Sequence, residues 1–181
     1  MLPQWVEYAR KAVDTGIPIT ICSNFAHIHS EEETDILARF YGITISIDTV
    51  DHQLYKKLRR GGDLRTLMFN MIKLRSAASK LGVMPHLTWC CVLSDQNWRG
   101  MMELVKQGVD LGVTTFCICN LNILPTPKGG TELKHVSTLP INEAVDAFNL
   151  LRDCQDYSAA CGAEFHLKSG ILDTLGNRLD R

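Results

Sequence analysis

The chain has 181 residues, which is enough for one domain with a substantial core. Its 19 Lys and Arg residues balance 20 Asp and Glu residues, and this net charge of −1 argues against a protein held to nucleic acid by phosphate neutralisation. The 45% of apolar residues is typical of a globular protein, yet no apolar run approaches the roughly 20 residues that span a bilayer.

The N-terminus shows no basic stretch followed by an apolar core, so we predict no signal peptide and no membrane association. The seven cysteines are an odd number, and two of them are adjacent. We therefore expect reduced thiols and a cytoplasmic location.

Short β-branched runs alternate with amphipathic segments along the chain. The predicted strands are 17–22, 43–47, 87–93, 115–121 and 163–167. The predicted helices are 2–14, a helix from 30, then 63–82, a helix from 95 or 97 to 112, and 140–162. Ser30 and Glu33 have the spacing of a capping box, and Gly82 is placed to end the helix that Asp63 begins. Residues 122–139 form a predicted loop, and the tail 168–181 is weakly specified.

Alternating strands and helices of these lengths predict parallel strands joined by right-handed crossovers. The fold class is therefore α/β, with residues 1–181 in one domain of four or five mostly parallel strands. Five strands are too few for a closed eight-stranded barrel. An open sheet and an incomplete barrel both remain at this point.

Polar side chains follow one face of the second strand. Ile43, Ile45 and Ile47 point one way, and Thr44, Ser46 and Asp48 point the other way. Because parallel sheets bind ligands at the carboxyl ends of their strands, we predict a polar pocket there. Its candidate residues are Ser23, Asn24, Ser46, Asp48 and Asn120. The alternative is that Asp48 caps the next segment and that Ser46 bonds locally.

A series of short motifs follows the chain: Cys22-Ser-Asn, Ile43-Thr-Ile-Ser-Ile-Asp-Thr, Asp51-His-Gln-Leu-Tyr, Leu58-Arg-Arg-Gly-Gly-Asp-Leu, Asn70 with Leu74, Cys91-Val-Leu with Asn97, and Leu111-Gly-Val. In their order and spacing these motifs resemble the radical S-adenosylmethionine (SAM) domain, in the subgroup of molybdenum-cofactor-type and peptide-modifying enzymes. The resemblance covers residues 2–162 and implies the second part of an incomplete (β/α) barrel with its helices on one side. It implies SAM binding by Ser46, Asp48 and Asn120, and substrate-side roles for Ser23 and Asn24.

Two departures from the family pattern stand out. Phe25 follows Asn24 where the family has glycine, and the C-x-x-x-C-x-x-C motif that holds a [4Fe–4S] cluster is missing. We therefore expect the cluster only in a full-length family domain, and a truncated domain that is inactive alone, with no catalytic residue assigned. Cys117 and Cys119 share a face of a predicted strand, which we expect to be the apolar one, with these cysteines as small buried hydrophobes.

Two other functions remain open. His27-x-His29 with Asp48 or His86 suggests a metal-dependent hydrolase, although a loop role is the simpler interpretation of the two histidines. A non-catalytic module that binds a partner is the third hypothesis. We expect a homodimer or larger assembly, or pairing with a missing N-terminal half, through the first strand or the open side of the sheet. On that side we expect Trp89, Cys91, Phe116 and Ile118 to be partly uncovered.

Overall fold

The computed structural model describes residues 4–60, 62–121, 133–168 and 170–179. Five strands form one sheet in chain order, and each neighbouring pair is parallel. The strands are β1 (Thr20–Ser23), β2 (Gly42–Ser46), β3 (His86–Leu93), β4 (Thr115–Asn120) and β5 (Glu164–Leu167). Sequential parallel strands without a reversal of order are the pattern of an incomplete barrel, so the predicted fold class is confirmed.

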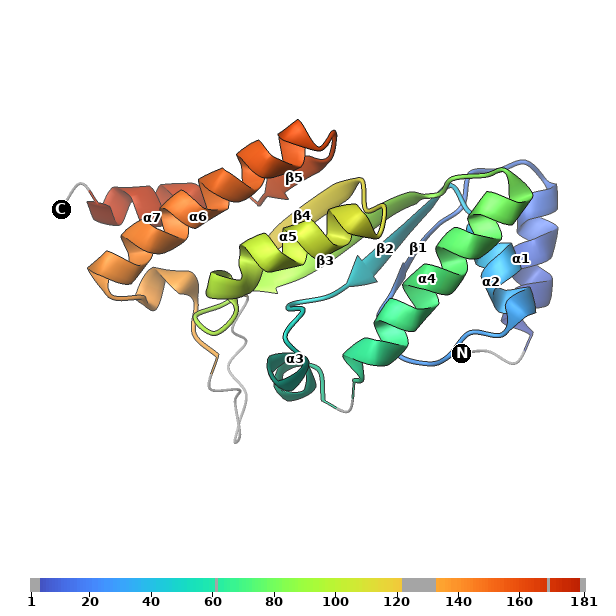
Figure 1. The fold of residues 1–181 in the computed structure, drawn as a ribbon, viewed down its shortest axis with the longest axis horizontal. Coiled ribbons are helices and arrows are strands. Elements are labelled where there is room, and N and C mark those ends of the chain that lie inside the picture. The colour runs from blue at the N-terminus through green and yellow to red at the C-terminus, as the bar shows by residue number, and fades with distance from the viewer. Residues whose placement is uncertain (1–3, 61, 122–132, 169, 180–181) are drawn as a thin grey trace.

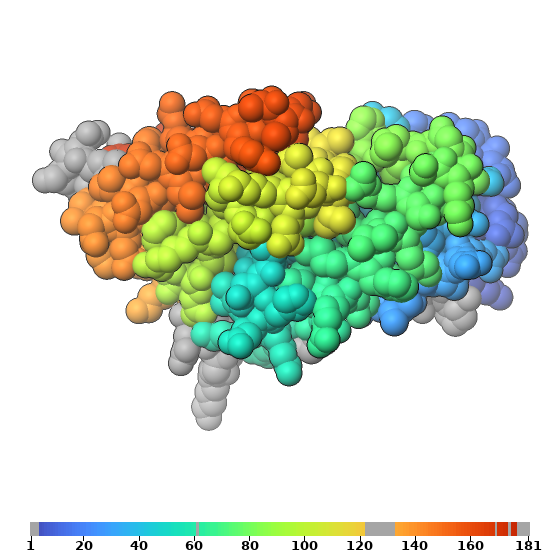
Figure 2. Space-filling view, in the orientation of Figure 1, coloured from blue at the N-terminus to red at the C-terminus, as the bar shows by residue number. Residues whose placement is uncertain are grey.

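Helices connect the strands and cover one face of the sheet (Figure 1). They are α1 (Trp5–Asp14), α2 (Glu31–Ala38), α3 (His52–Leu58), α4 (Leu64–Leu81), α5 (Met101–Asp110), α6 (Ile141–Ala160) and α7 (Ile171–Leu179), with short 3₁₀ turns η1 (Trp98–Gly100) and η2 (Val136–Thr138). In space-filling form, the side chains of α4, α5 and α6 close over most of this face (Figure 2). No described helix is both long enough and apolar enough to cross a membrane.

The strands of the sheet have one face under the helices and one open face. Ile43, Ile45 and Ile47 are almost completely buried, whereas Thr44 and Ser46 are half-buried on the opposite side. The predicted orientation of β2 is therefore confirmed. Strand register and alternation place the following side chains on the open face: Cys22, Thr44, Ser46, Thr88, Cys90, Val92, Thr115, Cys117, Cys119, Glu164 and His166.

The predicted orientation of β4 is wrong. Phe116 and Ile118 are fully buried with Trp89 and Cys91 beneath the helices, and Cys117 and Cys119 lie on the open face. A Cβ atom added at Gly108 of α5 would lie 2.5 Å from the ring of Phe116, so glycine allows this helix to lie directly on β4. The bulky side chains thus fill the space under α5, and the open face does not expose the apolar patch expected from the sequence.

The predicted caps of α2 and α4 are confirmed, and two helices are additional. Ser30 and Glu33 form the reciprocal capping box, with bonds of 3.1 and 2.7 Å, and Asp63 caps α4. The sequence did not predict α3, which Asp51 caps by accepting a 2.7 Å bond from the backbone N–H of Leu54. Part of the weakly specified tail forms α7, which packs on α6 and η2. Most of the predicted loop 122–139 lies outside the described residues.

Candidate functional site

Asp48 lies just beyond β2, at the carboxyl edge of the sheet. Its Oδ1 accepts a 2.9 Å hydrogen bond from the backbone N–H of Val92, and its Oδ2 accepts a 2.7 Å bond from Nε of Arg59. The residue is 8% exposed. The carboxylate therefore joins the end of β2 to β3 and holds the arginine that follows α3.

Asn97 reinforces the same junction from the other side. Its Nδ2 donates to the carbonyl oxygens of Asp48 (2.8 Å) and Val92 (2.9 Å). Its Oδ1 accepts from both the backbone N–H and the hydroxyl of Ser94, at 2.8 and 3.0 Å. Asn97 stands at the N-cap position of η1, which leads into α5, as the predicted helix start at 95 or 97 requires. Its side chain makes no capping bond, because this buried amide joins β2 to the loop after β3.

Two adjacent cavities open at this edge of the sheet. One, of about 260 Å³, is lined by Asp48, Leu58, Arg59, Val92, Ser94, Leu121 and Leu133. The other, of about 290 Å³, is lined by Asn24, Ala26, Tyr55, Leu58, Arg59, Arg60 and Gly62. Leu58 and Arg59 line both cavities, so the end of α3 is a wall between them. Parallel α/β sheets bind ligands at this edge, and these cavities are the candidate binding region.

The turn after β1 contains a backbone conformation that favours glycine. Phe25 has φ of 49° and is 1% exposed. A bulky residue with this φ is strained, and glycine is the residue that adopts it freely. Phe25 therefore takes a left-handed conformation at the position where the family pattern has glycine, and its ring is buried in the core.

Asn70 of α4 holds this strained turn in place. Its Nδ2 donates to the carbonyl oxygens of Phe25 (3.1 Å) and His27 (2.6 Å), and its Oδ1 accepts from the N–H of His29 at 3.1 Å. One buried amide thus satisfies three backbone groups of the loop. The sequence indicated Asn70 only through the family resemblance, because these contacts span more than 40 residues.

The predicted pocket residues divide between the two faces. Ser46 is on the open face, where its Oγ lies 3.9 Å from Sγ of Cys22, and Asn24 lines the second cavity. Ser23 pairs with Ile45 and so belongs to the helix-covered side, where its Oγ accepts from the N–H of Phe25. Asn120 also lies on that side, with its Oδ1 3.2 Å from Nε2 of His135. The structure therefore does not bring all five predicted residues into one pocket.

The two loop histidines meet Glu33, with the three ligand atoms within 4.8 Å of one another. Asp48 is bound to Arg59 instead, and His86 begins β3 at the opposite end of the sheet, so the predicted hydrolase set is not assembled. Burial is the main cause that lowers the pKa of His29 to about 4. Lys73 donates a hydrogen bond to the carbonyl of His29, and a cation beside the histidines disfavours a metal ion.

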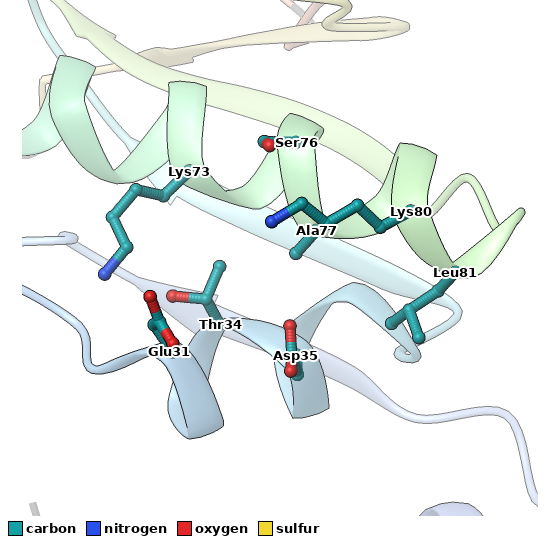
Figure 3. A pocket seen from close by; sticks show the side chains of 8 residues that line it. All are labelled: Glu31, Thr34, Asp35, Lys73, Ser76, Ala77, Lys80 and Leu81. Atoms are coloured by element: carbon teal, nitrogen blue, oxygen red, sulfur yellow. The ribbon is translucent and has the colours of Figure 1, made fainter.

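A further groove, of about 300 Å³, runs between α2 and α4 on the outer layer. Figure 3 shows Lys73 and Lys80 of α4 facing Glu31 and Asp35 of α2 across it. The groove lies between two helices that pack on each other, away from the carboxyl edge of the sheet. The carboxyl edge of the sheet remains the candidate site.

Neither a protein-family model nor a curated protein matches the sequence. Solved structures do match. The chain superposes on SuiB of Streptococcus suis with a TM-score of 0.67 at 19% identity, over 95% of this chain and 38% of SuiB. SuiB bound to S-adenosylmethionine matches with a TM-score of 0.67 at 18% identity, over 93% of this chain and 37% of SuiB.

A third structure, SuiB bound to the precursor peptide SuiA, matches with a TM-score of 0.64 at 17% identity, over 95% of this chain and 37% of SuiB. The chain therefore spans less than two fifths of the length of the proteins it resembles. This likeness shows the fold.

Proposed function

We propose that this chain supplies the second part of a radical SAM barrel and forms one wall of its SAM and substrate pocket. One observation supports this above all: the half-barrel, with its polar open face, superposes on SuiB bound to SAM over 93% of the chain. The order of the radical SAM-like motifs in the sequence also supports it. Several of them lie at the carboxyl ends of β1, β2 and β3, and Asn70 of α4 binds the turn after β1.

The open face offers groups that suit SAM, whose ribose, adenine and amino-acid groups need hydrogen-bond partners. Ser46 is half-buried, and the long contact with Cys22 leaves its hydroxyl able to bind a ligand. Ser46 would contact SAM, Asp48 would keep Arg59 at the cavity wall, and Asn24 would line the substrate side. Because Asn120 lies on the helix-covered side, it would contact only a part of the ligand that extends beyond the end of β4. The SuiA complex of SuiB favours a peptide as the substrate class.

In the family, an iron–sulfur cluster supplies the electron that cleaves SAM. Cys90, Cys117 and Cys119 do not fit such a cluster, because their sulfur atoms lie almost in contact on neighbouring strands and leave no space for four irons. We therefore propose that the chain alone binds SAM weakly and does not cleave it.

The prediction for SAM has two parts. Saturation-transfer NMR should show saturable SAM binding with a Kd on the order of 0.1–1 mM, weakened at least several-fold by Ser46→Ala. Ser76→Ala, on the outer helix layer, is the matched control and should leave binding unchanged.

The second part concerns cleavage of SAM. After reconstitution of the chain with iron, sulfide and dithionite, the amount of 5′-deoxyadenosine formed should not exceed that in a protein-free control. Equal binding by both variants would contradict the SAM wall, and 5′-deoxyadenosine formation would contradict inactivity.

We also propose that β1 pairs with another strand, from a second copy or from a preceding half-barrel. β1 is at the edge of the sheet, and its side chains alternate between exposed and half-exposed. Light scattering should give a mass above the 20.3 kDa of one chain at tens of micromolar protein. Thr20→Lys should favour the monomer, because a charge on an edge strand opposes pairing, whereas Thr15→Lys should not. A wild-type monomer at this concentration would exclude self-pairing.

A further inference from the structure

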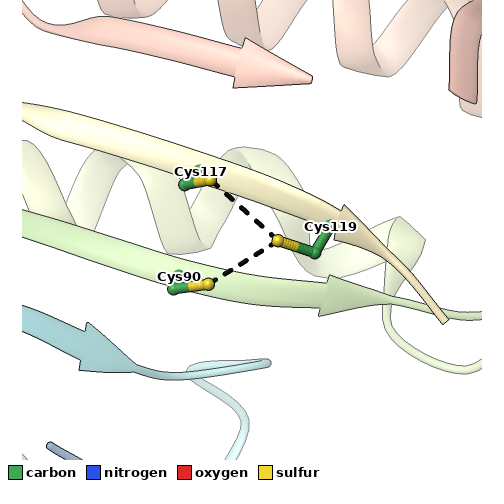
Figure 4. A group of neighbouring side chains, drawn as sticks. All are labelled: Cys90, Cys117 and Cys119. Atoms are coloured by element: carbon green, nitrogen blue, oxygen red, sulfur yellow. Dashed lines mark hydrogen bonds between the residues drawn. The ribbon is translucent and has the colours of Figure 1, made fainter. Parts of the chain in front are cut away.

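Three free thiols gather on the open face where β3 and β4 run side by side. Sγ of Cys90 lies 3.7 Å from Sγ of Cys119, which lies 4.0 Å from Sγ of Cys117, and all three atoms are within 4.8 Å of one another. Figure 4 shows the three side chains pointing toward a common centre, one from β3 and two from β4. Cys90 and Cys117 are register partners, so the strand pairing itself places these sulfurs together.

These distances match the coordination of one metal ion. A Zn–S bond of about 2.3 Å gives sulfur–sulfur separations of about 3.8 Å in a tetrahedral site and about 4.0 Å in a trigonal one. The Cys90–Cys119 and Cys117–Cys119 separations of 3.7 and 4.0 Å therefore have the spacing of a bound ion, and the Cys90–Cys117 separation lies within 4.8 Å. They are half-buried, so a ligand has access from the open face.

We propose that Cys90, Cys117 and Cys119 form a binding site for a single thiophilic cation, with Zn²⁺ as its natural occupant. Binding converts three thiols to thiolates and releases three protons, and a water molecule or an external ligand completes the coordination from the open face. No fourth His, Cys, Asp or Glu ligand lies within 4.8 Å among the described residues. Such a site would keep an open coordination position, as catalytic zinc sites do.

The charges around the thiols are compatible with this site. Three thiolates and Zn²⁺ carry a net charge of −1. Burial and the neighbouring Cys119 raise the pKa of Cys117, and the Lys168 cation after β5 opposes this rise. Burial and the neighbouring Cys119 together raise the pKa of Cys90 to about 12. Because metal binding releases the thiol protons, metal affinity should rise with pH.

The site is tested by cobalt substitution under anaerobic, reducing conditions. Titration of the full chain with Co²⁺ should produce a thiolate-to-cobalt charge-transfer band that saturates at one ion per chain, and Zn²⁺ should abolish it. Ser replacement at Cys90, Cys117 or Cys119 should weaken Zn²⁺ binding by roughly 100-fold, measured by competition with a chromophoric chelator. Zn²⁺ should also raise the Tm of the wild type but not of these variants.

Two cysteines provide matched controls. Cys22 lies on the same open face outside the cluster, and Cys161 is exposed after α6, so Cys22→Ser and Cys161→Ser should bind Zn²⁺ like the wild type. Circular dichroism checks that each variant is folded. Absence of the charge-transfer band, or Zn²⁺ binding retained when all three cluster cysteines are serine, would overturn the proposal. An equal loss of Zn²⁺ affinity in Cys22→Ser would also overturn it. None of these outcomes depends on SAM binding.

Discussion

Replacing Asn97 by alanine is expected to lower the free energy of unfolding by about 3 kcal/mol, since it leaves buried backbone groups without partners. The amide donates to the carbonyls of Asp48 and Val92 and accepts two bonds from Ser94. Because Asn97 is 2% exposed, water cannot replace these bonds without opening the junction between β2 and β3. Urea unfolding followed by circular dichroism measures the difference.

Two variants separate this role from the loss of any amide side chain. Gln96→Ala removes a neighbouring amide that makes none of these bonds, and it should change stability by less than about 0.5 kcal/mol. Asn97→Asp keeps the acceptor for Ser94 but loses both donated bonds, so it should destabilise the protein nearly as much as alanine does. If Asn97→Ala and Gln96→Ala were equally stable, the junction would not depend on this side chain.

His29 is expected to make the protein less stable as the pH falls below 7. Burial is the largest cause that lowers its pKa from 6.5 to about 4; His27 and Lys73 act in the same direction, and Glu33 opposes them. The unfolded chain therefore binds a proton between these values that the folded chain does not bind. The free energy of unfolding should fall by about 2 kcal/mol between pH 7 and pH 5 through this residue.

His29→Leu should remove most of this pH dependence. Neither ring nitrogen of His29 has a hydrogen-bond partner in the described structure, so leucine leaves no polar group unsatisfied there. His52→Leu, at an exposed position in α3, is the control and should keep the slope. An unchanged slope in His29→Leu would contradict a neutral buried imidazole.

Glu33 contributes a separate pH dependence at lower pH. Burial raises the pKa of Glu33, but the hydrogen bonds from Ser30 and Trp5 and the nearby histidines lower it, and the net effect is a lowered pKa. The stabilisation that the Glu33 carboxylate provides is therefore lost mainly below pH 4.5.

The sequence by itself determined the five strands, the helices other than α3 and α7, and the fold class. The β-branched runs, the capping box of Ser30 and Glu33 and the position of Gly82 specify local structure, since each acts within a few residues. The strict alternation of isoleucine with polar residues also determined the orientation of β2, because only one of its faces suits the core.

The tertiary structure alone decided which face β4 turns to the helices and what the polar residues bind. Both faces of Phe116-Cys-Ile-Cys are apolar, so alternation does not predict which face is buried. The space that Gly108 leaves between α5 and β4 accommodates the ring of Phe116, and this face therefore lies under the helices. Likewise, the bonds of Asn97 to Asp48 and of Asn70 to the turn at Phe25 join segments more than 40 residues apart. The three thiols meet only because β3 and β4 pair in one register, which no spacing along the chain reveals.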